Sequence, residues 1–319
     1  MRIVVLDGYT LNPGDNSWSP VESLGDVAIY DRTPSELVVE RATGAGVVIA
    51  NKVVLSQPVI NALPDLKMIA VTATGFNVVD IQAARARDIP VCNVPVYGTD
   101  TVAQHVMAVL LTLCHQPVAH DQAIRDGEWF RQNGDFCFWK KPLIELAGKT
   151  MGIVGFGRIG RRVGQLANAF GMPVIAHDLF HGDPPGFEPF QWQTLEEVFA
   201  NADVVSLHCP QTEDNAGFVN RSLLEKMQPS AILINAARGG IYNEQDLTDA
   251  LNQGVIAGAC LDVFASEPIA EDSPLLAAKN CLLTPHIAWA TLEARARIMG
   301  TTADNIAAFQ RGNPENVVN

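Results

Sequence analysis

The chain has 319 residues, of which 48% are hydrophobic and 18% are charged, and its formal net charge at pH 7 is −13. This length is sufficient for two domains, each with a core of its own. The acidic balance argues against a nucleic-acid surface, which requires clustered Lys and Arg to neutralise phosphates. No apolar run is long enough to span a membrane, and the run in the N-terminal MRIVVLDGY is too short for a signal peptide. We therefore expect a cytoplasmic protein whose partners include neither nucleic acid nor membrane.

The six cysteines are scattered and include no CxxC pair. Several stand in apolar runs, which predicts buried free thiols in a reducing compartment and no metal site. They are Cys92, Cys114, Cys137, Cys209, Cys260 and Cys281.

Residues 1–93 repeat a unit of one strand followed by one helix. Alternation of near-continuous apolar strands with helices predicts a parallel sheet that is covered on both faces. Ligands bind such sheets beyond the carboxyl ends of the strands, which points to the loop TATGFN at 72–77. Its small residues allow backbone N–H groups to converge on a carboxylate, although a plain turn is the alternative. The predicted strands are 3–6, 27–30, 47–50, 68–71 and 90–92, and the predicted helices are 34–42, 57–63 and 79–87.

A long apolar helix is predicted at 99–115, where Thr99 or Asp100 can cap its start. Residues 117–141 then carry five aromatic side chains among polar and charged neighbours. Such aromatics indicate either a subunit contact or a cover over the neighbouring domain. We expect a homodimer, the commonest closed symmetry, with residues 99–141 at its interface. The aromatic residues are Trp129, Phe130, Phe136, Phe138 and Trp139.

The stretch 149–178 has the pattern of a strand, a glycine turn, a helix and a second strand. Gly155 permits the tight turn, Gly157 lets a diphosphate approach the backbone, and Gly160 allows the helix and the strand to pack closely. The free N–H groups and the positive dipole end of the helix then face the anion. Glycine-rich turns are common, but the flanking strands and helix together predict a dinucleotide site.

Asp178 ends the second strand, where a carboxylate can accept hydrogen bonds from the ribose diol of an adenosine. The same carboxylate repels a 2′-phosphate, and the following Leu179 and Phe180 supply no arginine to hold one. The expected cofactor is therefore NAD and not NADP.

Strands and helices continue to alternate after this motif, so that residues 99–290 form a complete doubly wound dinucleotide fold. The expected fold class is α/β, with two doubly wound parallel-sheet domains, one flavodoxin-like and one Rossmann, and a cleft between them. We expect the last helix, 291–310, to return to the first domain, so that the substrate domain is 1–98 plus 291–319 and the NAD domain is 99–290. The remaining predicted strands are 204–207, 231–235, 256–261 and 282–283, and the helices are 195–199, 223–227 and 245–251.

Three polar residues follow predicted strands at the carboxyl edge of the second sheet, where a nicotinamide is expected to lie. Arg238 stands in NAARGG, Glu267 in DVFASEP and His286 in TPHIAW. Taken singly, each is more often structural, as a solvated arginine, a surface glutamate or a satisfied core histidine. Their gathering at one edge of a nucleotide-binding fold indicates a catalytic group.

These segments resemble the D-isomer-specific 2-hydroxyacid dehydrogenase family over essentially the full length of the chain. The resemblance is carried by GFGRIG at 155–160, NAARGG at 235–240, DVFASEP at 262–268 and PHIA at 285–288. Within the family, YGTDTVAQH at 97–105 and PHIAWAT at 285–291 resemble the glycerate dehydrogenase (hydroxypyruvate reductase) branch.

The resemblance implies NADH-dependent reduction of a small 2-oxoacid to the D-2-hydroxyacid, with hydroxypyruvate or glyoxylate as the expected substrate. Arg238 would hold the 2-oxo group and one carboxylate oxygen. His286 would give a proton to the carbonyl oxygen as hydride arrives, and Glu267 would fix the imidazole tautomer and favour the imidazolium. The backbone at Thr74 and Gly75 would bind the substrate carboxylate.

The resemblance also assigns cofactor contacts beyond the three glycines. By resemblance, Arg158 and Ile159 would contact the diphosphate, Asp178 the ribose, Cys209 and Ala236 the backbone-lined path of the cofactor, and Asp262 the carboxamide.

The chain departs from many relatives in the loop that would bind the substrate carboxylate. Those relatives carry a charged residue and a second glycine where this chain has Val71 and Ala73, and an acid in place of Gln104. This departure leaves open which side chain meets a 3-hydroxyl.

Two other functions stay open at this point. Formate dehydrogenase shares the fold, but that group carries a glutamine at the place of Glu267. An NADH-sensing interaction protein would keep the same residues and would bind NADH without turnover.

Overall fold

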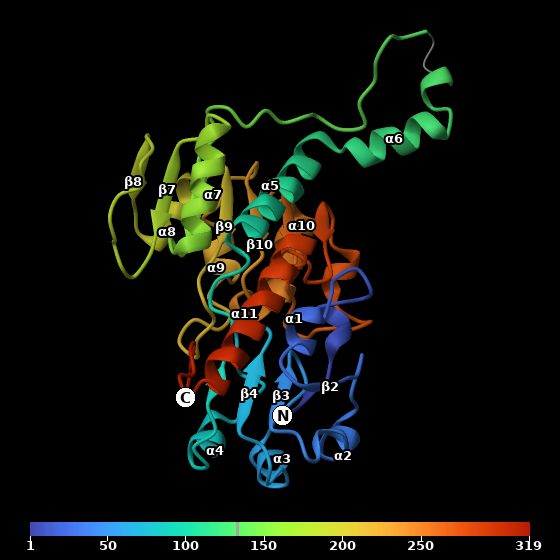
Figure 1. The fold of residues 1–319 in the computed structure, drawn as a ribbon. Helices are drawn as coiled ribbons and strands as arrows, with labels where there is room; N and C mark the ends of the chain where they lie inside the picture. The colour runs from blue at the N-terminus through green and yellow to red at the C-terminus, as the bar shows by residue number, and fades with distance from the viewer. Residues whose placement is uncertain (132–133) are drawn as a thin grey trace. The chain divides into compact units, whose positions relative to one another are not determined.

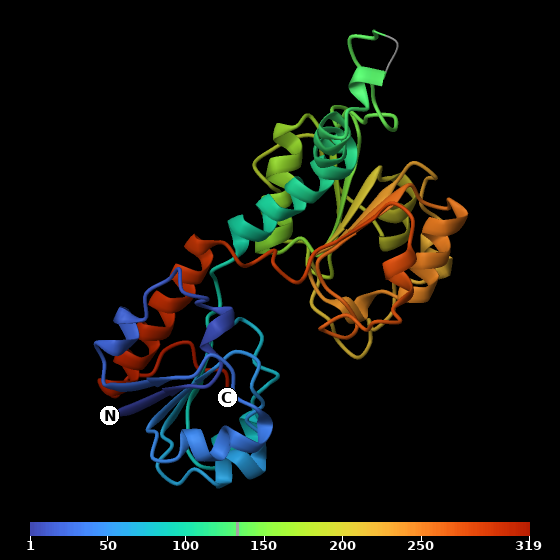
Figure 2. The ribbon, with the colours of Figure 1, turned by 90° about the vertical axis from the view of Figure 1, so that its right-hand side faces the viewer.

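The computed structural model describes residues 1–131 and 134–319, and the chain divides into two compact units (Figure 1 and Figure 2). The first unit comprises Met1–Gly98 with Trp289–Asn319, and the second unit comprises Thr99–Ala288. Each unit is a parallel sheet with helices on both faces.

The first unit is built on a five-stranded parallel sheet in the order β2-β1-β3-β4-β5. This is the flavodoxin-like order, and its topological switch point lies between β1 and β3. Most strand residues are buried, because helices cover both faces of the sheet. The strands are β1 (Arg2–Val5), β2 (Asp26–Ile29), β3 (Val47–Ala50), β4 (Met68–Val71) and β5 (Val91–Cys92), and the helices are α1 (Ser19–Glu22), α2 (Val38–Ala42), α3 (Gln57–Asn61), α4 (Ile81–Arg85) and α11 (Leu292–Gln310).

Alternate residues of these strands face two separate cores. Val4 and Ile69 lie in one core with residues of α2, α3 and α4. Ile3 and Met68 pack with residues of α1 and α11 on the other face. The C-terminal α11, in red in Figure 2, therefore covers a sheet whose strands come from the N-terminal part of the chain.

The second unit is built on a seven-stranded parallel sheet in the order β12-β11-β10-β9-β6-β7-β8. Strands β7 and β8 are added on one side of β6, and β9 to β12 are added on its other side. The switch point therefore lies between β6 and β9, where Rossmann folds bind dinucleotides. The predicted α/β class with two doubly wound sheets is thus confirmed. The sequence does not predict β8, because it has only three residues and the middle one is polar and exposed. The strands are β6 (Met151–Val154), β7 (Val174–His177), β8 (Phe190–Trp192), β9 (Val204–Leu207), β10 (Ile232–Asn235), β11 (Gly258–Leu261) and β12 (Cys281–Leu283).

Helices α5 and α7 cover one face of this second sheet, and α8, α9 and α10 cover the other. Eight residues of α5 are buried, as its apolar composition predicts. Among the described residues no single helix is long and apolar enough to cross a membrane; α5 and α6 reach that length and composition only together, and they are bent by 49° at their junction. The helices are α5 (Thr99–His115), α6 (Pro117–Arg125), α7 (Arg158–Ala169), α8 (Leu195–Asn201), α9 (Arg221–Leu224) and α10 (Glu244–Gln253).

Helix α6 and the chain that follows it extend away from the sheet of the second unit, in green in Figure 1. Phe130 and Phe136 are 89% and 88% exposed there, and Trp139 is 62% exposed. These aromatics therefore do not cover the sheet, which was one of the two interpretations of this segment. Gln132 and Asn133, which fall within the predicted interface, lie outside the described residues.

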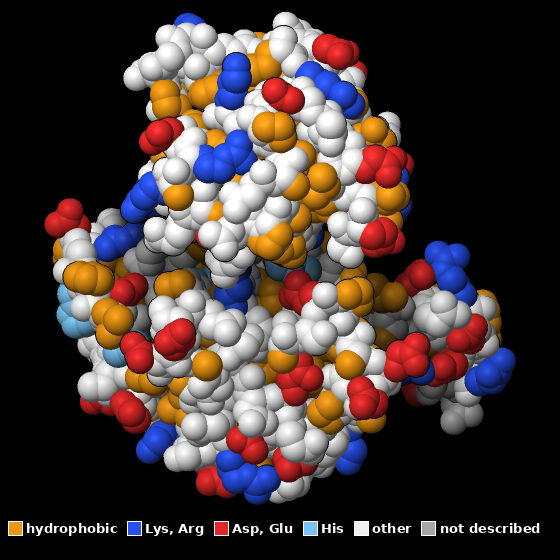
Figure 3. Space-filling view, turned by 90° about the horizontal axis from the view of Figure 1, so that it is seen from below, with side chains coloured by type: hydrophobic (Ala, Val, Ile, Leu, Met, Phe, Trp, Pro, Cys, Tyr) orange, Lys and Arg blue, Asp and Glu red, His pale blue; other side chains and the backbone are white. Residues whose placement is uncertain are grey.

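Both signs of charge occur on the molecular surface. Acidic and basic side chains are interspersed on the face drawn in Figure 3, and the hydrophobic side chains there gather in small groups. On this face the acidic side chains are therefore not concentrated on one element.

Candidate active site

The turn between β6 and α7 contains three glycines, and packing within the protein requires two of them but not the third. Gly155 has φ +91°, and a Cβ there would lie 2.5 Å from the backbone nitrogen of Cys209. A Cβ on Gly160 would lie 2.2 Å from the carbonyl oxygen of Gly155. A Cβ on Gly157, by contrast, would meet no atom within 4 Å. The open space at Gly157 is what a diphosphate needs to approach the backbone.

Helix α7 begins at Arg158, directly after this turn. Gly157 stands at its N-cap and has no side chain to accept a hydrogen bond from the first turn. The N–H groups of that turn are therefore available to an anion, and the helix dipole favours negative charge at this end. Arg158 is exposed and Ile159 is half-buried in the first turn, so the residues present fit a dinucleotide diphosphate.

Asp178 stands directly after β7 and is tied to the glycine turn. Its Oδ2 accepts a hydrogen bond from the backbone N–H of Phe156 at 2.6 Å, and its Oδ1 accepts one from Phe180 at 3.1 Å. The carboxylate is thus fixed where a ribose diol would donate to its remaining lone pairs.

Cys209 follows β9 on the other side of the switch point. Burial raises the pKa of the Cys209 thiol, which keeps it protonated and poorly nucleophilic at neutral pH. Burial also lowers the pKa of the neighbouring His208 to about 4, and its Nε2 lies 2.8 Å from the Ser206 hydroxyl oxygen. Ala236 follows the adjacent β10 and is half-buried. Cys209 and Ala236 thus follow neighbouring strands at the carboxyl edge of the sheet, a position that suits contact with a cofactor.

Glu267 and His286 form a hydrogen-bonded pair at the carboxyl edge of the sheet. The Oε2 of Glu267 lies 2.6 Å from Nδ1 of His286, and each side chain is about one third exposed, at 31% and 32%. The other oxygen, Oε1, accepts a hydrogen bond from the backbone N–H of Phe264 at 3.2 Å. A carboxylate on Nδ1 fixes the tautomer and leaves Nε2 as the nitrogen that can exchange a proton with a substrate.

The backbone of His286 is held in an unusual conformation. Its φ is +54°, a left-handed value that is strained for a residue other than glycine. Asp262 is only 2% exposed and holds the loop around His286. Its Oδ1 accepts hydrogen bonds from the Thr284 hydroxyl at 2.6 Å and from the N–H of Ile287 at 2.9 Å. Its Oδ2 accepts one from the N–H of Ala288 at 2.8 Å. Such strain persists where surrounding contacts over-determine the backbone, and it is typical of functional sites.

Sequence reasoning missed this role of Asp262 and the histidine beside it. Both oxygens of Asp262 bind the loop that carries the catalytic histidine candidate. The contact with the cofactor carboxamide, which the resemblance assigned to Asp262, stays a prediction. His105 on α5 places its Nε2 3.6 Å from Asp262 Oδ1 and 3.3 Å from Thr284 Oγ1. Burial lowers the pKa of His105, and the Asp262 carboxylate opposes that shift. The contacts join residues far apart in sequence, and no local pattern marks them.

Arg238 is exposed on the loop that follows β10. Asn235 shapes this loop, because its Nδ2 donates to the Arg238 carbonyl at 2.9 Å and its Oδ1 accepts from the N–H of Ala237. A Cβ on Gly239 would lie 1.9 Å from the backbone of Phe264, so the Arg238 loop packs directly on the loop that leads to Glu267. Since β10, β11 and β12 are neighbours, the structure brings the loops of Arg238, Glu267 and His286 together at one edge.

Thr74 and Gly75 belong to the first unit, in the loop after β4. The Thr74 hydroxyl donates to the Val94 carbonyl at 2.9 Å, and Asn93 Nδ2 donates to the Thr74 carbonyl at 2.7 Å. Both Thr74 and Gly75 are exposed, and within residues 1–131 and 134–319 their backbone N–H groups donate to no protein acceptor. Fixed, exposed N–H groups of this kind suit a carboxylate ligand.

A Rossmann sheet with an open glycine turn, a ribose-binding carboxylate and a carboxylate-held histidine at its edge defines an NAD-dependent dehydrogenase. The sequence model of "D-isomer specific 2-hydroxyacid dehydrogenase, NAD binding domain" matches residues 107–288. The chain belongs to the D-isomer specific 2-hydroxyacid dehydrogenase family. The predicted family, enzyme class and cofactor NAD are thus confirmed.

Named relatives agree with this assignment. The chain is 46% identical to a hydroxypyruvate reductase of Blautia hydrogenotrophica over 322 residues, covering 100% of both chains. It is 40% identical to a glycerate dehydrogenase of Methylorubrum extorquens over 288 residues, covering 90% of this chain and 89% of the relative. Among solved structures, D-lactate dehydrogenase from Escherichia coli superposes with a TM-score of 0.85 at 27% identity, with 100% of both chains covered.

Proposed function

We propose that this enzyme uses NADH to reduce hydroxypyruvate to D-glycerate and glyoxylate to glycolate. The observation that carries the proposal is the 2.6 Å pair of Glu267 and His286 at the carboxyl edge of an NAD-binding sheet. The names of the similar proteins, hydroxypyruvate reductase and glycerate dehydrogenase, support the choice of substrate.

The residues of this chain divide the chemistry between them. Bound NADH supplies a hydride to the carbonyl carbon of the substrate. Arg238 holds the 2-oxo group and one carboxylate oxygen, which polarises the carbonyl. His286 donates its Nε2 proton to the carbonyl oxygen as negative charge develops there, and Glu267 stabilises the imidazolium from the opposite nitrogen. In the oxidation direction, neutral His286 takes the proton from the substrate hydroxyl.

The N–H groups of Thr74 and Gly75 receive the substrate carboxylate in this proposal. The cofactor contacts are assigned to the glycine turn, Arg158 and Ile159 at the diphosphate, Asp178 at the ribose, and Cys209 and Ala236 along the path toward the nicotinamide. Asp262 acts through the His286 loop as a positioning residue, as its hydrogen bonds to Thr284, Ile287 and Ala288 suggest.

A substrate panel tests this proposal. Initial rates of NADH oxidation are measured with hydroxypyruvate, glyoxylate, pyruvate and longer 2-oxoacids, and each is repeated with NADPH. We expect hydroxypyruvate and glyoxylate to give the highest kcat/KM, and NADPH to be poorer because of Asp178. Tight NADH binding without turnover of any 2-oxoacid would instead favour the NADH-sensing alternative.

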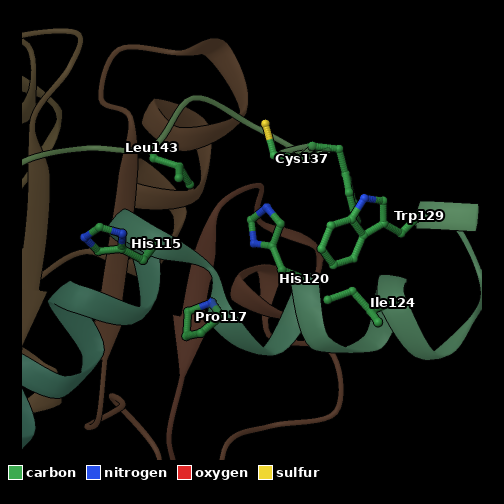
Figure 4. A pocket seen from close by; sticks show the side chains of 8 residues that line it. His115, Pro117, His120, Ile124, Trp129, Cys137 and Leu143 are labelled. Carbon is green, nitrogen blue, oxygen red and sulfur yellow. The ribbon is translucent and has the colours of Figure 1, made fainter. Parts of the chain in front are cut away.

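We further propose that the enzyme is a cytoplasmic homodimer. A second copy of the chain would cover the exposed aromatics at Phe130, Phe136 and Trp139. The same segment and α6 line an open, mostly apolar pocket of about 350 Å³, seen in Figure 4, with Ile124 and Trp129 among its lining residues. The presence of all six cysteines as free thiols fits a reducing compartment.

Light scattering tests the dimer, with Phe136→Asp as the variant. We expect twice the monomer mass for the wild type and a shift toward the monomer for the variant, because an aspartate there would be buried without a partner. A wild-type monomer at micromolar concentration would contradict the proposal.

A further inference from the structure

The sequence leaves open which side chain meets the 3-hydroxyl of hydroxypyruvate, and the first unit contains a candidate. Lys52 follows β3 and Arg32 follows β2 at the carboxyl edge of the five-stranded sheet, and both are exposed. Lys52 lies beside the topological switch point between β1 and β3, where open sheets of this kind bind ligands.

The backbone that carries Lys52 is fixed by Asp7, which follows β1. The Asp7 carboxylate accepts hydrogen bonds from the N–H groups of Asn51 at 2.8 Å, Lys52 at 2.5 Å and Val53 at 2.9 Å. Three backbone donors on one carboxylate hold the turn in a single conformation. The backbone of Lys52, from which its side chain extends, is therefore fixed, whereas the residue itself is exposed to solvent.

Asn51 connects this turn to the loop that receives the substrate carboxylate. Its Nδ2 donates to the carbonyl oxygen of Thr72 at 3.0 Å and lies 3.1 Å from the Thr72 hydroxyl oxygen, and Asn51 is only 7% exposed. Strands β3 and β4 are paired up to Ala50 and Val71, so Lys52 leaves the sheet one strand away from the loop of Thr74. One strand spacing is about 4.8 Å, which the flexible four-carbon stem of a lysine spans.

The two cations of this edge differ in what they contact. The guanidinium of Arg32 lies over the Tyr9 ring, 3.9 Å from its centroid, and β2 is three strands away from β4. The Lys52 ammonium makes no hydrogen bond or ion pair with any residue in 1–131 or 134–319. Lys52 is thus the nearer cation to the carboxylate loop by strand order, and it has donors to offer.

We propose that Lys52 is a specificity-determining residue that donates a hydrogen bond to the C3 hydroxyl of a 2-oxoacid whose carboxylate is bound by Thr74 and Gly75. The inference rests on the proposed function and deepens it, because it defines the substrate class as 2-oxoacids with a hydroxyl group at C3. Glyoxylate has no C3, and pyruvate presents a methyl group that leaves the ammonium unsatisfied. A site built to hydrogen-bond a hydroxyl discriminates strongly against an analogue that lacks it.

The test compares Lys52→Met with the matched control Arg32→Met, using kcat/KM for hydroxypyruvate, glyoxylate and pyruvate with NADH. Lys52→Met keeps the length of the side chain and the backbone N–H that Asp7 binds. We expect at least about a tenfold loss with hydroxypyruvate, mostly in KM, and less than about a twofold change with glyoxylate. Arg32→Met is expected to change neither, and Lys52→Arg to retain most of the preference.

Two results would overturn the inference while the proposed function stands. An equal loss on hydroxypyruvate and glyoxylate in Lys52→Met would show that Lys52 only binds the common carboxylate, and undiminished hydroxypyruvate reduction would show that it has no part in recognition. A wild-type enzyme that reduces neither substrate would refute the proposed function itself. Thermal unfolding of each variant checks that the fold is retained.

Discussion

Gly157→Ala separates cofactor binding from folding, because the structure gives the new methyl group no protein contact. A Cβ at this position would have no atom within 4 Å, and φ −76° with ψ −157° is ordinary extended backbone. Replacing the N-cap glycine by alanine costs roughly 0.5–1 kcal/mol, and the loss of unfolded-chain entropy offsets about 0.4–1 kcal/mol of this. We therefore expect the free energy of unfolding to stay within about 1 kcal/mol of the wild type.

The same methyl group would stand where we propose that the cofactor diphosphate approaches the backbone. We expect the Kd for NADH to rise at least about tenfold, which corresponds to about 1.4 kcal/mol. Fluorescence titration with NADH and urea unfolding of the same samples measure the two quantities independently.

Gly160→Ala is the matched control. Its Cβ would lie 2.2 Å from the Gly155 carbonyl oxygen, a backbone atom that cannot move without displacing the turn. We expect this variant to lose at least about 2 kcal/mol of stability as well as NADH affinity. Native NADH affinity in Gly157→Ala would refute the placement of the diphosphate, and unfolding comparable to Gly160→Ala would refute the claim that the space is open.

Three further predictions concern the proposed catalytic pair and the stability of each unit. Glu267→Gln keeps the size of the side chain but removes a charge 2.6 Å from His286, and that charge is worth about 1.6 kcal/mol at the dielectric constant of water. We therefore expect kcat to fall about fifteenfold or more at a nearly constant Kd for NADH. A Glu267→Asp control, which shortens the side chain, should also lose activity, and an unchanged kcat in Glu267→Gln would contradict the proposed role. Burial lowers the pKa of His208 from 6.5 to about 4, so between these two pH values the unfolded chain binds a proton that the folded chain does not. The stability that neutral His208 contributes is complete above pH 6.5 and is lost as the pH falls toward 4, by up to about 3 kcal/mol. Urea unfolding of His208→Gln should therefore depend less steeply on acid pH than that of the wild type. Arg295 is only 7% exposed and donates to both carboxylate oxygens of Asp15, at 2.5 and 2.6 Å, and to two backbone carbonyls. Arg295→Met should therefore destabilise the first unit by about 3 kcal/mol, and Asp15→Asn should destabilise it by less. Equal unfolding midpoints for Arg295→Met and the wild type would contradict this prediction.

Most of the fold was predictable because the sheets are parallel and buried. Strands such as 47–50 and 68–71 are apolar at every position, and helices on both faces make that pattern necessary. The sequence does not predict β8, which is an edge strand whose residues are only partly buried. It also does not predict α6, which starts after Gln116 in a left-handed conformation and buries only Ala123. An exposed helix of this kind lacks the apolar periodicity on which such predictions depend.

The site was predictable where chemistry is local and unpredictable where it depends on tertiary contacts. Gly155, Gly157 and Gly160 follow a spacing that the sequence displays, but only the structure distinguishes the glycines that packing requires from the one that leaves space. The loop held by Asp262 depends on hydrogen bonds to residues more than twenty positions later in the chain. Neither periodicity nor spacing could reveal such contacts.

The most direct test of the central claim is the conversion of hydroxypyruvate by NADH, with chiral analysis of the glycerate formed and His286→Ala measured beside the wild type. We predict D-glycerate in step with NADH oxidation for the wild type, and a loss of roughly 10² to 10⁴ in kcat for His286→Ala with NADH binding retained. Undiminished turnover in His286→Ala, or L-glycerate as the product, would contradict the account.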